Sequence, residues 1–269
     1  MKTDVDKARQ VARQLSDEQL EELMSLIKGA NSVELKLTVP ATAHRATVQG
    51  LPLDPVEAQP RQVYFFDTPD LDLYKAGVVV RARRVQGGKG DTVVKLRPVV
   101  PDDLPAKLRR ESMFNVEVDA LPGGYVCSAS FKGQTTGQQV WDSVGRKRKL
   151  SKIFSKGQRA FYASHAPDGL DMDSLVALGP TFILKARFTA HTAKKKSAPD
   201  RSIVTEVWLY PDGSRILELS TKCPPADTFK IAAETRDYLE SQGVPINGVQ
   251  ETKTKAALQF YARQLAKPE

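Results

Sequence analysis

Charged side chains at every second position of several strand-like segments most constrain the fold of this chain. In residues 32–38, apolar Val and Leu alternate with Glu34 and Lys36, which is the period of a strand with one apolar and one polar face. The same alternation returns in residues 79–83, 93–97, 183–187 and 216–222. Strands of this kind need an apolar cover on one side and either water or charged ligands on the other.

Composition limits the classes of protein to consider. The chain has 269 residues and a formal net charge of +8, so it can bury a sizeable core and its partner is expected to be anionic. Cys127 and Cys223 are far apart and belong to no CxxC motif, which argues against a disulfide framework or a zinc site. No apolar run is long enough to span a membrane and the N-terminus is charged, so we expect a cytoplasmic protein without membrane contact.

Periodicity and turn residues predict the order of the elements. Helices are expected over 4–28, with Ser16 capping a second segment, and over 226–242 and 251–266. Strands are expected over 32–39, 61–67, 78–85, 92–99, 108–118, 158–163, 181–189, 202–210 and 215–222. Residues 40–60 are predicted to form a loop with a short strand near 44–48, and residues 121–152 show no clear pattern. We expect one domain overall, with helical ends over 1–30 and 226–269 around a barrel over 31–225.

The charged faces carry more cations than acids. The cations are Lys36, Arg81, Arg83, Lys95, Arg97, Arg109, Arg159, Lys185, Arg187 and Lys222, and the acids are Glu34, Glu111, Glu206 and Glu218. About seven successive antiparallel strands with this arrangement favour a closed barrel with a polar lumen over a flat solvated sheet.

A cationic lumen needs an anionic guest. Two like charges 4 Å apart repel by about 4 kcal/mol at an effective dielectric near 20, so counter-anions must balance the lumen. Arg binds phosphate oxygens in a bidentate manner, and Glu is a natural ligand for Mg²⁺ or Mn²⁺. A triphosphate or polyphosphate bridged by such a metal is therefore the expected guest.

Several short motifs together resemble a known family. They are Val33–Leu37, Tyr64–Thr68, the pairs Arg81/Arg83 and Lys95/Arg97, Arg109–Glu111, Phe154–Arg159, Glu206 and Glu218. In order and strand placement they resemble the CYTH superfamily, the triphosphate tunnel metalloenzymes that include class IV adenylate cyclases, thiamine triphosphatases and inorganic tripolyphosphatases. The resemblance implies an α+β fold, a closed antiparallel eight-stranded β-barrel with helices packed outside.

The resemblance also implies roles for individual residues. The metal, Mg²⁺ or Mn²⁺, would be bound by Glu34, Glu111, Glu206 and Glu218. Phosphates would be held by Lys36, Arg81, Arg83, Lys95, Arg97, Arg109, Arg159, Lys185 and Arg187. Glu111 or Glu218 would orient the attacking water, and Lys95 would assist catalysis. For each Glu, the alternative is an internal salt bridge to a neighbouring Arg.

Two positions depart from the family pattern. The first strand of the family usually has Glu-x-Glu-x-Lys, whereas this chain has Ser32 at the first Glu, and Ser220 stands where a late strand usually has a second acid. Loss of two carboxylates lowers the negative charge available for a second cation, so one metal is easier to accommodate than two.

Four functions are compatible with the sequence. A metal-dependent hydrolase of inorganic or organic triphosphates fits best, followed by a class IV adenylate cyclase and by a polyphosphate-binding module with weak or no catalysis. Nucleic-acid binding comes last, because most basic residues lie on alternating strand positions, although the basic runs 146–149 and 194–196 keep it open. A homodimer is compatible with the helical ends.

Overall fold

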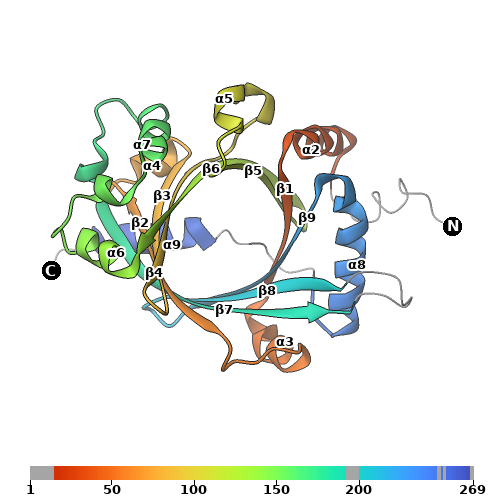
Figure 1. Ribbon diagram of the computed structural model, residues 1–269. Helices are drawn as coiled ribbons and strands as arrows, with labels where there is room; N and C mark the ends of the chain where they lie inside the picture. The colour runs from red at the N-terminus through yellow and green to blue at the C-terminus, as the bar shows by residue number, and fades with distance from the viewer. Residues whose placement is uncertain (1–14, 192–199, 247–249, 251–252, 267–269) are drawn as a thin grey trace.

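The computed structural model describes residues 15–191, 200–246, 250 and 253–266, and within them nine strands close a barrel (Figure 1). The order around the barrel is β1-β5-β6-β4-β3-β2-β7-β8-β9. The strands are β1 (Ser32–Val39), β2 (Gln59–Asp67), β3 (Val78–Val85), β4 (Lys89–Leu96), β5 (Phe114–Leu121), β6 (Gly124–Thr136), β7 (Val176–Ala190), β8 (Arg201–Leu209) and β9 (Arg215–Cys223).

The closed barrel is confirmed, but its predicted make-up of eight antiparallel strands is wrong. All neighbouring strands are antiparallel except β1 and β5, which pair in parallel. The extra strand is β6, which pairs with both β4 and β5. It was missed because small residues weaken the pattern: Cys127, Ala129 and Phe131 do alternate with Ser128, Ser130 and Lys132, but Cys, Ala and Ser differ little in size and polarity.

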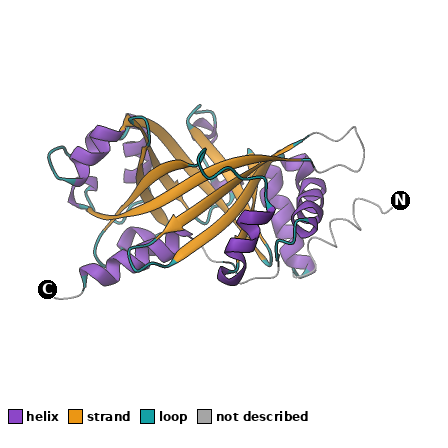
Figure 2. Ribbon diagram, turned by 90° about the horizontal axis from the view of Figure 1, so that it is seen from below, coloured by secondary structure: helices purple, strands orange, loops and turns teal. Residues whose placement is uncertain are grey.

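Most of the helices lie around the outside of the barrel (Figures 1 and 2), whereas α9 is seen through the barrel opening in Figure 1. The α-helices are α2 (Asp17–Gly29), α3 (His44–Gly50), α4 (Asp72–Lys75), α5 (Ala106–Arg109), α6 (Gly137–Val144), α7 (Lys156–Ala163), α8 (Thr228–Ser241) and α9 (Lys253–Leu265). Short 3₁₀ segments are Ala41–Ala43, Pro101–Asp103, Leu150–Ile153, Met172–Ser174 and Pro225–Asp227. None of the described helices is both long and apolar enough to cross a bilayer.

Several helix predictions are confirmed. α2 begins after Ser16, whose hydroxyl accepts from the Gln19 backbone N–H at 3.2 Å while the Gln19 side chain accepts from the Ser16 N–H at 2.9 Å. This reciprocal pair is a capping box, which satisfies two backbone donors at the helix start. Residues 4–14 of the predicted first helix and the run 194–196 lie outside the described residues.

Other predictions are wrong for local reasons. Residues 108–118 do not form one strand: α5 ends at Arg109, and β5 starts only at Phe114, where apolar alternation begins. Residues 158–163 are helical because Ser155 and Gln158 form a capping box and Phe161 and Tyr162 bury one helix face. The short strand expected near residue 44 is α3.

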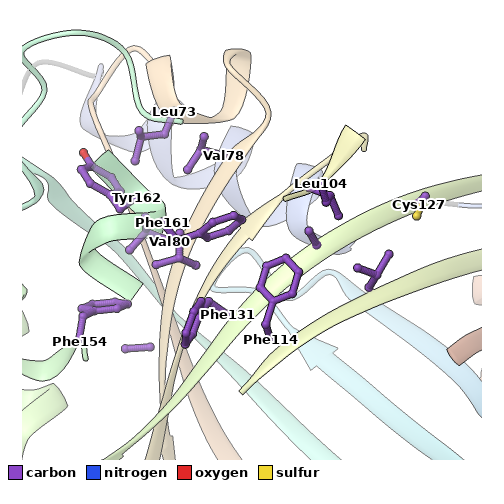
Figure 3. Close-up of a cluster of buried hydrophobic side chains, with 14 of the residues drawn as sticks. Leu73, Val78, Val80, Leu104, Phe114, Cys127, Phe131, Phe154, Phe161 and Tyr162 are labelled. Carbon is purple, nitrogen blue, oxygen red and sulfur yellow. The ribbon is translucent and has the colours of Figure 1, made fainter. Parts of the chain in front are cut away.

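The main core lies between the outer wall of the barrel and the helices (Figure 3). Phe114 packs edge-on against Phe161 with ring centroids 5.5 Å apart, and Val80 and Leu73 belong to the same cluster. Because successive side chains of a strand point to opposite faces, burying Val80 on the outside directs Arg81 into the lumen. The outer core therefore positions the charged interior.

Helix α9 covers lumen-facing apolar residues. Its Leu258 and Tyr261 pack with Phe65 of β2 and with Trp208 and Ile216 of β8 and β9. Phe65 and Trp208 also line the interior cavity. The C-terminal helix thus closes off an apolar part of the lumen and brings Lys253 to the cavity.

Candidate active site

The interior of the barrel is a cavity of about 1090 Å³ with a strongly cationic lining. Among the described residues, eleven Lys and Arg side chains line it against five carboxylates. The cations are Lys36, Lys75, Arg81, Arg83, Lys95, Arg97, Lys132, Lys185, Lys222, Lys253 and Lys255, and the acids are Glu34, Glu117, Asp119, Glu206 and Glu218. The sequence-predicted residues Glu34, Lys36, Arg81, Arg83, Lys95, Arg97, Lys185, Glu206 and Glu218 are thus brought together.

Three acids converge from two neighbouring strands. Glu34 of β1 lies beside Asp119 of β5 in the parallel register, and Glu117 lies beside Ser32. The carboxylates of Glu34, Glu117 and Asp119 offer oxygens that all lie within 4.8 Å of one another. The Ser32 hydroxyl donates to Glu117 at 3.1 Å. Strand β5 therefore supplies acids beside the position where the family pattern has a carboxylate and this chain has a hydroxyl.

Asp119 was missed because the predicted strand stopped at residue 118, whereas Glu117 lay inside that strand and was passed over in favour of Glu111. A signal was available: from residue 114 to 120, Phe, Val, Val and Ala alternate with Asn, Glu and Asp.

Cations surround this acidic group. Lys36 Nζ lies 2.9 Å from Asp119 Oδ1 and 3.3 Å from Glu34, while Lys222 pairs with Glu117. Lys95 and Arg97 lie 3.5 and 3.4 Å from Asp119 Oδ2. Burial raises the pKa of Asp119, but the charges of Lys36, Lys95 and Arg97 outweigh it and hold the pKa far below its usual range. For Lys95, burial dominates and lowers the pKa to about 8.

A second pair of acids is bridged by a lysine of α9. Glu206 and Glu218 lie opposite each other on β8 and β9. Lys253 Nζ lies 2.6 Å from a carboxylate oxygen of each, and 5.0 Å from the centre of the Trp208 ring. Lys185 is a second cation, 3.7 Å from Glu206. Burial lowers the pKa of Lys253, but the charges of Glu218 and Glu206 raise it more, so an ammonium stands between the two acids.

Strands β2, β3 and β7 carry the least balanced positive charge. Arg83 pairs with Asp91 at 2.8 Å, but Arg81 has no carboxylate within 4.0 Å among the described residues. Its Nε is buried without a hydrogen-bond partner there. Burial, and then the charge of Arg83, lowers the pKa of Arg81 to about 10. Burial likewise lowers the pKa of Lys185 and of Arg61. Cations outnumber acids here even though Arg83 and Lys185 each have an acidic partner, so this part of the cavity is a candidate binding site for an anion.

The structure places four predicted site residues elsewhere. Glu111 is exposed in the connection between α5 and β5, so it is not a tunnel carboxylate. Arg109 donates to the Gly29 carbonyl at 2.7 Å, and Arg159 of α7 donates to the Ser151 carbonyl at 3.2 Å. Arg109 thus joins α5 to the end of α2, and Arg159 joins α7 to the 3₁₀ segment Leu150–Ile153; neither side chain lines the cavity. Arg187 is on β7, but it is exposed and does not line the cavity.

The two acidic groups differ in how well they fit a divalent cation. Three converging carboxylates provide the hard oxygen ligands that Mg²⁺ and Mn²⁺ prefer, so Glu34, Glu117 and Asp119 fit such an ion. Glu206 and Glu218 do not fit one as arranged, because Lys253 already lies between them. The candidate metal ligands are therefore Glu34, Glu117 and Asp119, in place of the predicted Glu34, Glu111, Glu206 and Glu218.

Comparison with known proteins identifies the fold. No protein-family model matches the sequence, and no curated protein matches it. Among solved structures, HpAC1 from Hippeastrum superposes with a TM-score of 0.61 at 16% identity, over 84% of this chain and 95% of that one. HpAC1 is described as an adenylyl cyclase candidate that reveals a dominant triphosphatase activity. This chain has the CYTH fold.

A second structure agrees with that assignment. A proposed adenylate cyclase from Bacillus halodurans superposes with a TM-score of 0.55 at 11% identity, over 84% of this chain and 97% of that one. At these identities the likeness establishes the CYTH fold alone. Within that fold, this chain carries Ser32 and Ser220 at two positions expected to be acidic, and Lys253 between two of the acids that remain.

Proposed function

We propose that this protein hydrolyses a triphosphate, inorganic or organic, whose phosphate chain lies in the barrel with Mg²⁺ or Mn²⁺. The observation that carries the proposal is the excess of cations in one cavity, above all Arg81, which lacks an acidic partner among the described residues. A buried guanidinium without a partner is costly, and phosphate oxygens satisfy it in bidentate geometry.

Each group of residues has a distinct part in this proposal. Arg81, Arg83 and Lys185 would bind the phosphates along β3 and β7, and Lys36, Lys95 and Arg97 would neutralise them near β1 and β5. Glu34, Glu117 and Asp119 would hold the metal. When bound, the metal supplies charge neutralisation and polarises the terminal phosphoryl group.

A cavity carboxylate is also needed to orient the attacking water. Of the two sequence-predicted candidates, Glu218 lines the cavity and Glu111 does not, so Glu218 is the one proposed for this role. The triphosphatase activity named for HpAC1 supports a hydrolase over a cyclase.

A second candidate function is a polyphosphate-binding module with little catalysis. It is favoured by one specific observation: each of the five cavity carboxylates lies within ion-pair distance of a Lys side chain. In particular, Lys253 Nζ lies within 2.6 Å of both Glu206 and Glu218, where a metal would otherwise be attracted.

Phosphate release from tripolyphosphate and from ATP, with Mg²⁺ or Mn²⁺, separates these functions. We expect metal-dependent release by the wild-type protein and a loss of at least about tenfold in Glu34→Gln, which corresponds to about 1.4 kcal/mol of transition-state stabilisation. Glu111→Gln is the matched control and should retain wild-type activity, because Glu111 is exposed outside the cavity.

The other outcomes are equally clear. Tight binding of tripolyphosphate without release would support the binding module, and cyclic AMP formed from ATP would support a cyclase. The absence of both tripolyphosphate binding and phosphate release would contradict the proposal.

A further inference from the structure

The barrel is closed, but the ladder between β1 and β5, the only parallel strand pair among the described residues, is short. β1 pairs with β5 from Ser32 to Leu35, against Glu117 to Ala120, and this ladder then stops. β1 continues to Val39, but its later residues pair only with β9. The backbone of β1 after Leu35 therefore has a strand on one side only, next to the turn that joins β5 to β6.

An apolar groove lies on the outer side of this seam. Its volume is about 710 Å³, and it runs between α8 and the outer faces of β8, β9 and β1. The apolar residues that line it include Leu35, Leu37, Ile203, Leu219, Leu239 and Val244. At its rim, Arg236 and Glu240 pair with each other at 3.2 Å and are exposed. The rim is thus polar and the interior aliphatic, as in a site for a small apolar group.

The groove and the cationic cavity adjoin each other. Lys36, Leu121, Pro122 and Gly123 line both hollows, so the β5–β6 turn and the middle of β1 form a shared border. Lys36 Nζ points to the acidic group of the cavity, where it pairs with Asp119 at 2.9 Å. A molecule with a charged end and an apolar end could therefore place each end in a matching environment across one border.

The chemistry of the groove selects among organic groups. Of the described residues that line it, none is aromatic and none carries a side-chain amide. A nucleobase is usually held by stacking on rings as well as by hydrogen bonds to its edges, and the residues of this groove offer no ring for stacking. Leu, Ile and Val side chains instead match a flexible aliphatic chain, whose burial removes apolar surface from water.

We propose that the groove binds the aliphatic group of a phosphate ester whose phosphates lie in the cavity, so that the substrate class is an alkyl or isoprenyl polyphosphate. The inference rests on the proposed function in taking the cavity as the phosphate site. It adds that the organic group leaves the barrel at the seam between β1 and β5, next to Lys36.

Calorimetric titration with geranyl diphosphate and with inorganic pyrophosphate tests the proposal. In the wild-type protein, geranyl diphosphate should bind at least about tenfold more tightly than pyrophosphate. Ala232 lines the groove from α8, so Ala232→Trp should fill it and bring the two affinities close together without weakening pyrophosphate. Ala233→Trp is the matched control, because Ala233 is equally half-buried on α8 but does not line the groove. Thermal melting shows whether each variant is folded.

The outcomes distinguish this inference from the proposed function. Equal wild-type affinities for the two ligands would overturn the groove proposal, and this comparison needs no variant. An Ala232→Trp protein that loses pyrophosphate as strongly as geranyl diphosphate would overturn it too. If geranyl diphosphate is preferred but neither it nor tripolyphosphate is hydrolysed with Mg²⁺, the groove proposal stands and the hydrolase fails. If tripolyphosphate is hydrolysed without any preference for the geranyl group, only the groove proposal fails.

Discussion

At the scale of single residues, function and stability oppose each other at Arg81. Its guanidinium lies among other cations, and burial lowers its pKa to about 10. A charge held in such a position destabilises the free protein and favours any anion that enters. The same side chain should therefore weaken the fold and strengthen ligand binding.

Arg81→Met is expected to raise the free energy of unfolding by about 1 kcal/mol, because a partly buried cation without an acidic partner becomes an apolar side chain of similar length. Urea denaturation without phosphate measures this change. Arg148→Met, on the exposed basic run, should leave stability within about 0.5 kcal/mol of wild type. A clear loss of stability in Arg81→Met would show that Arg81 is a structural residue instead.

Lys253 lies between two acids, so removing its charge should lower the free energy of unfolding, whereas Arg81→Met should raise it. In Lys253→Met, Glu206 and Glu218 face each other without their shared cation, and stability should fall by about 3 kcal/mol. Mn²⁺ should then raise the melting temperature of this variant more than that of wild type, because the two carboxylates become free to bind it.

Lys255→Met is the control for Lys253, since Lys255 also lines the cavity but is exposed. Equal melting shifts with Mn²⁺ in all three proteins would mean that Lys253 does not block a cation site at Glu206 and Glu218.

The residues of the candidate site were predictable only where their strands were placed correctly. Glu34, Arg81 and Glu218 lie on strands with clear alternation, and the structure puts all three in the cavity. Asp119 was missed because the predicted strand stopped at residue 118. Lys253 could not be found from a pattern, since only tertiary packing of α9 brings it between two strands.

At the scale of elements, α9 links the apolar and the charged parts of the interior. Its Leu258 is 2% exposed and packs with Phe65 and Trp208, while Lys253 at its start reaches the acids. The sequence predicted this helix over 251–266 from its apolar spacing, but gave no sign that it packs on lumen-facing residues. Helical period shows which face is buried and cannot show what buries it.

Leu258→Ala should lower the free energy of unfolding by about 3 kcal/mol, because it leaves a cavity in a packed cluster. Leu265→Ala on the same helix should change it by less than about 0.5 kcal/mol, since Leu265 is 52% exposed. Thermal or urea unfolding of the pair measures the difference. Similar small changes in both variants would contradict the packing of α9 against the barrel.

At the scale of the whole molecule, the closed barrel turns a sequence pattern into a binding site. On an open sheet, the alternating charges would face water and be screened. Closure brings eleven cations and five acids among the described residues around one cavity of about 1090 Å³. Screening is weaker inside a cavity than on an open surface, so the excess positive charge favours a compact polyanion.

Calorimetric titration of the protein with tripolyphosphate, without added metal, tests the central claim most directly. The account predicts about one bound tripolyphosphate per chain, an affinity that falls as salt is added, and a loss of at least about tenfold in Arg81→Met but not in Arg148→Met. Absence of binding, or an equal loss in both variants, would contradict the assignment of the barrel interior as the phosphate site.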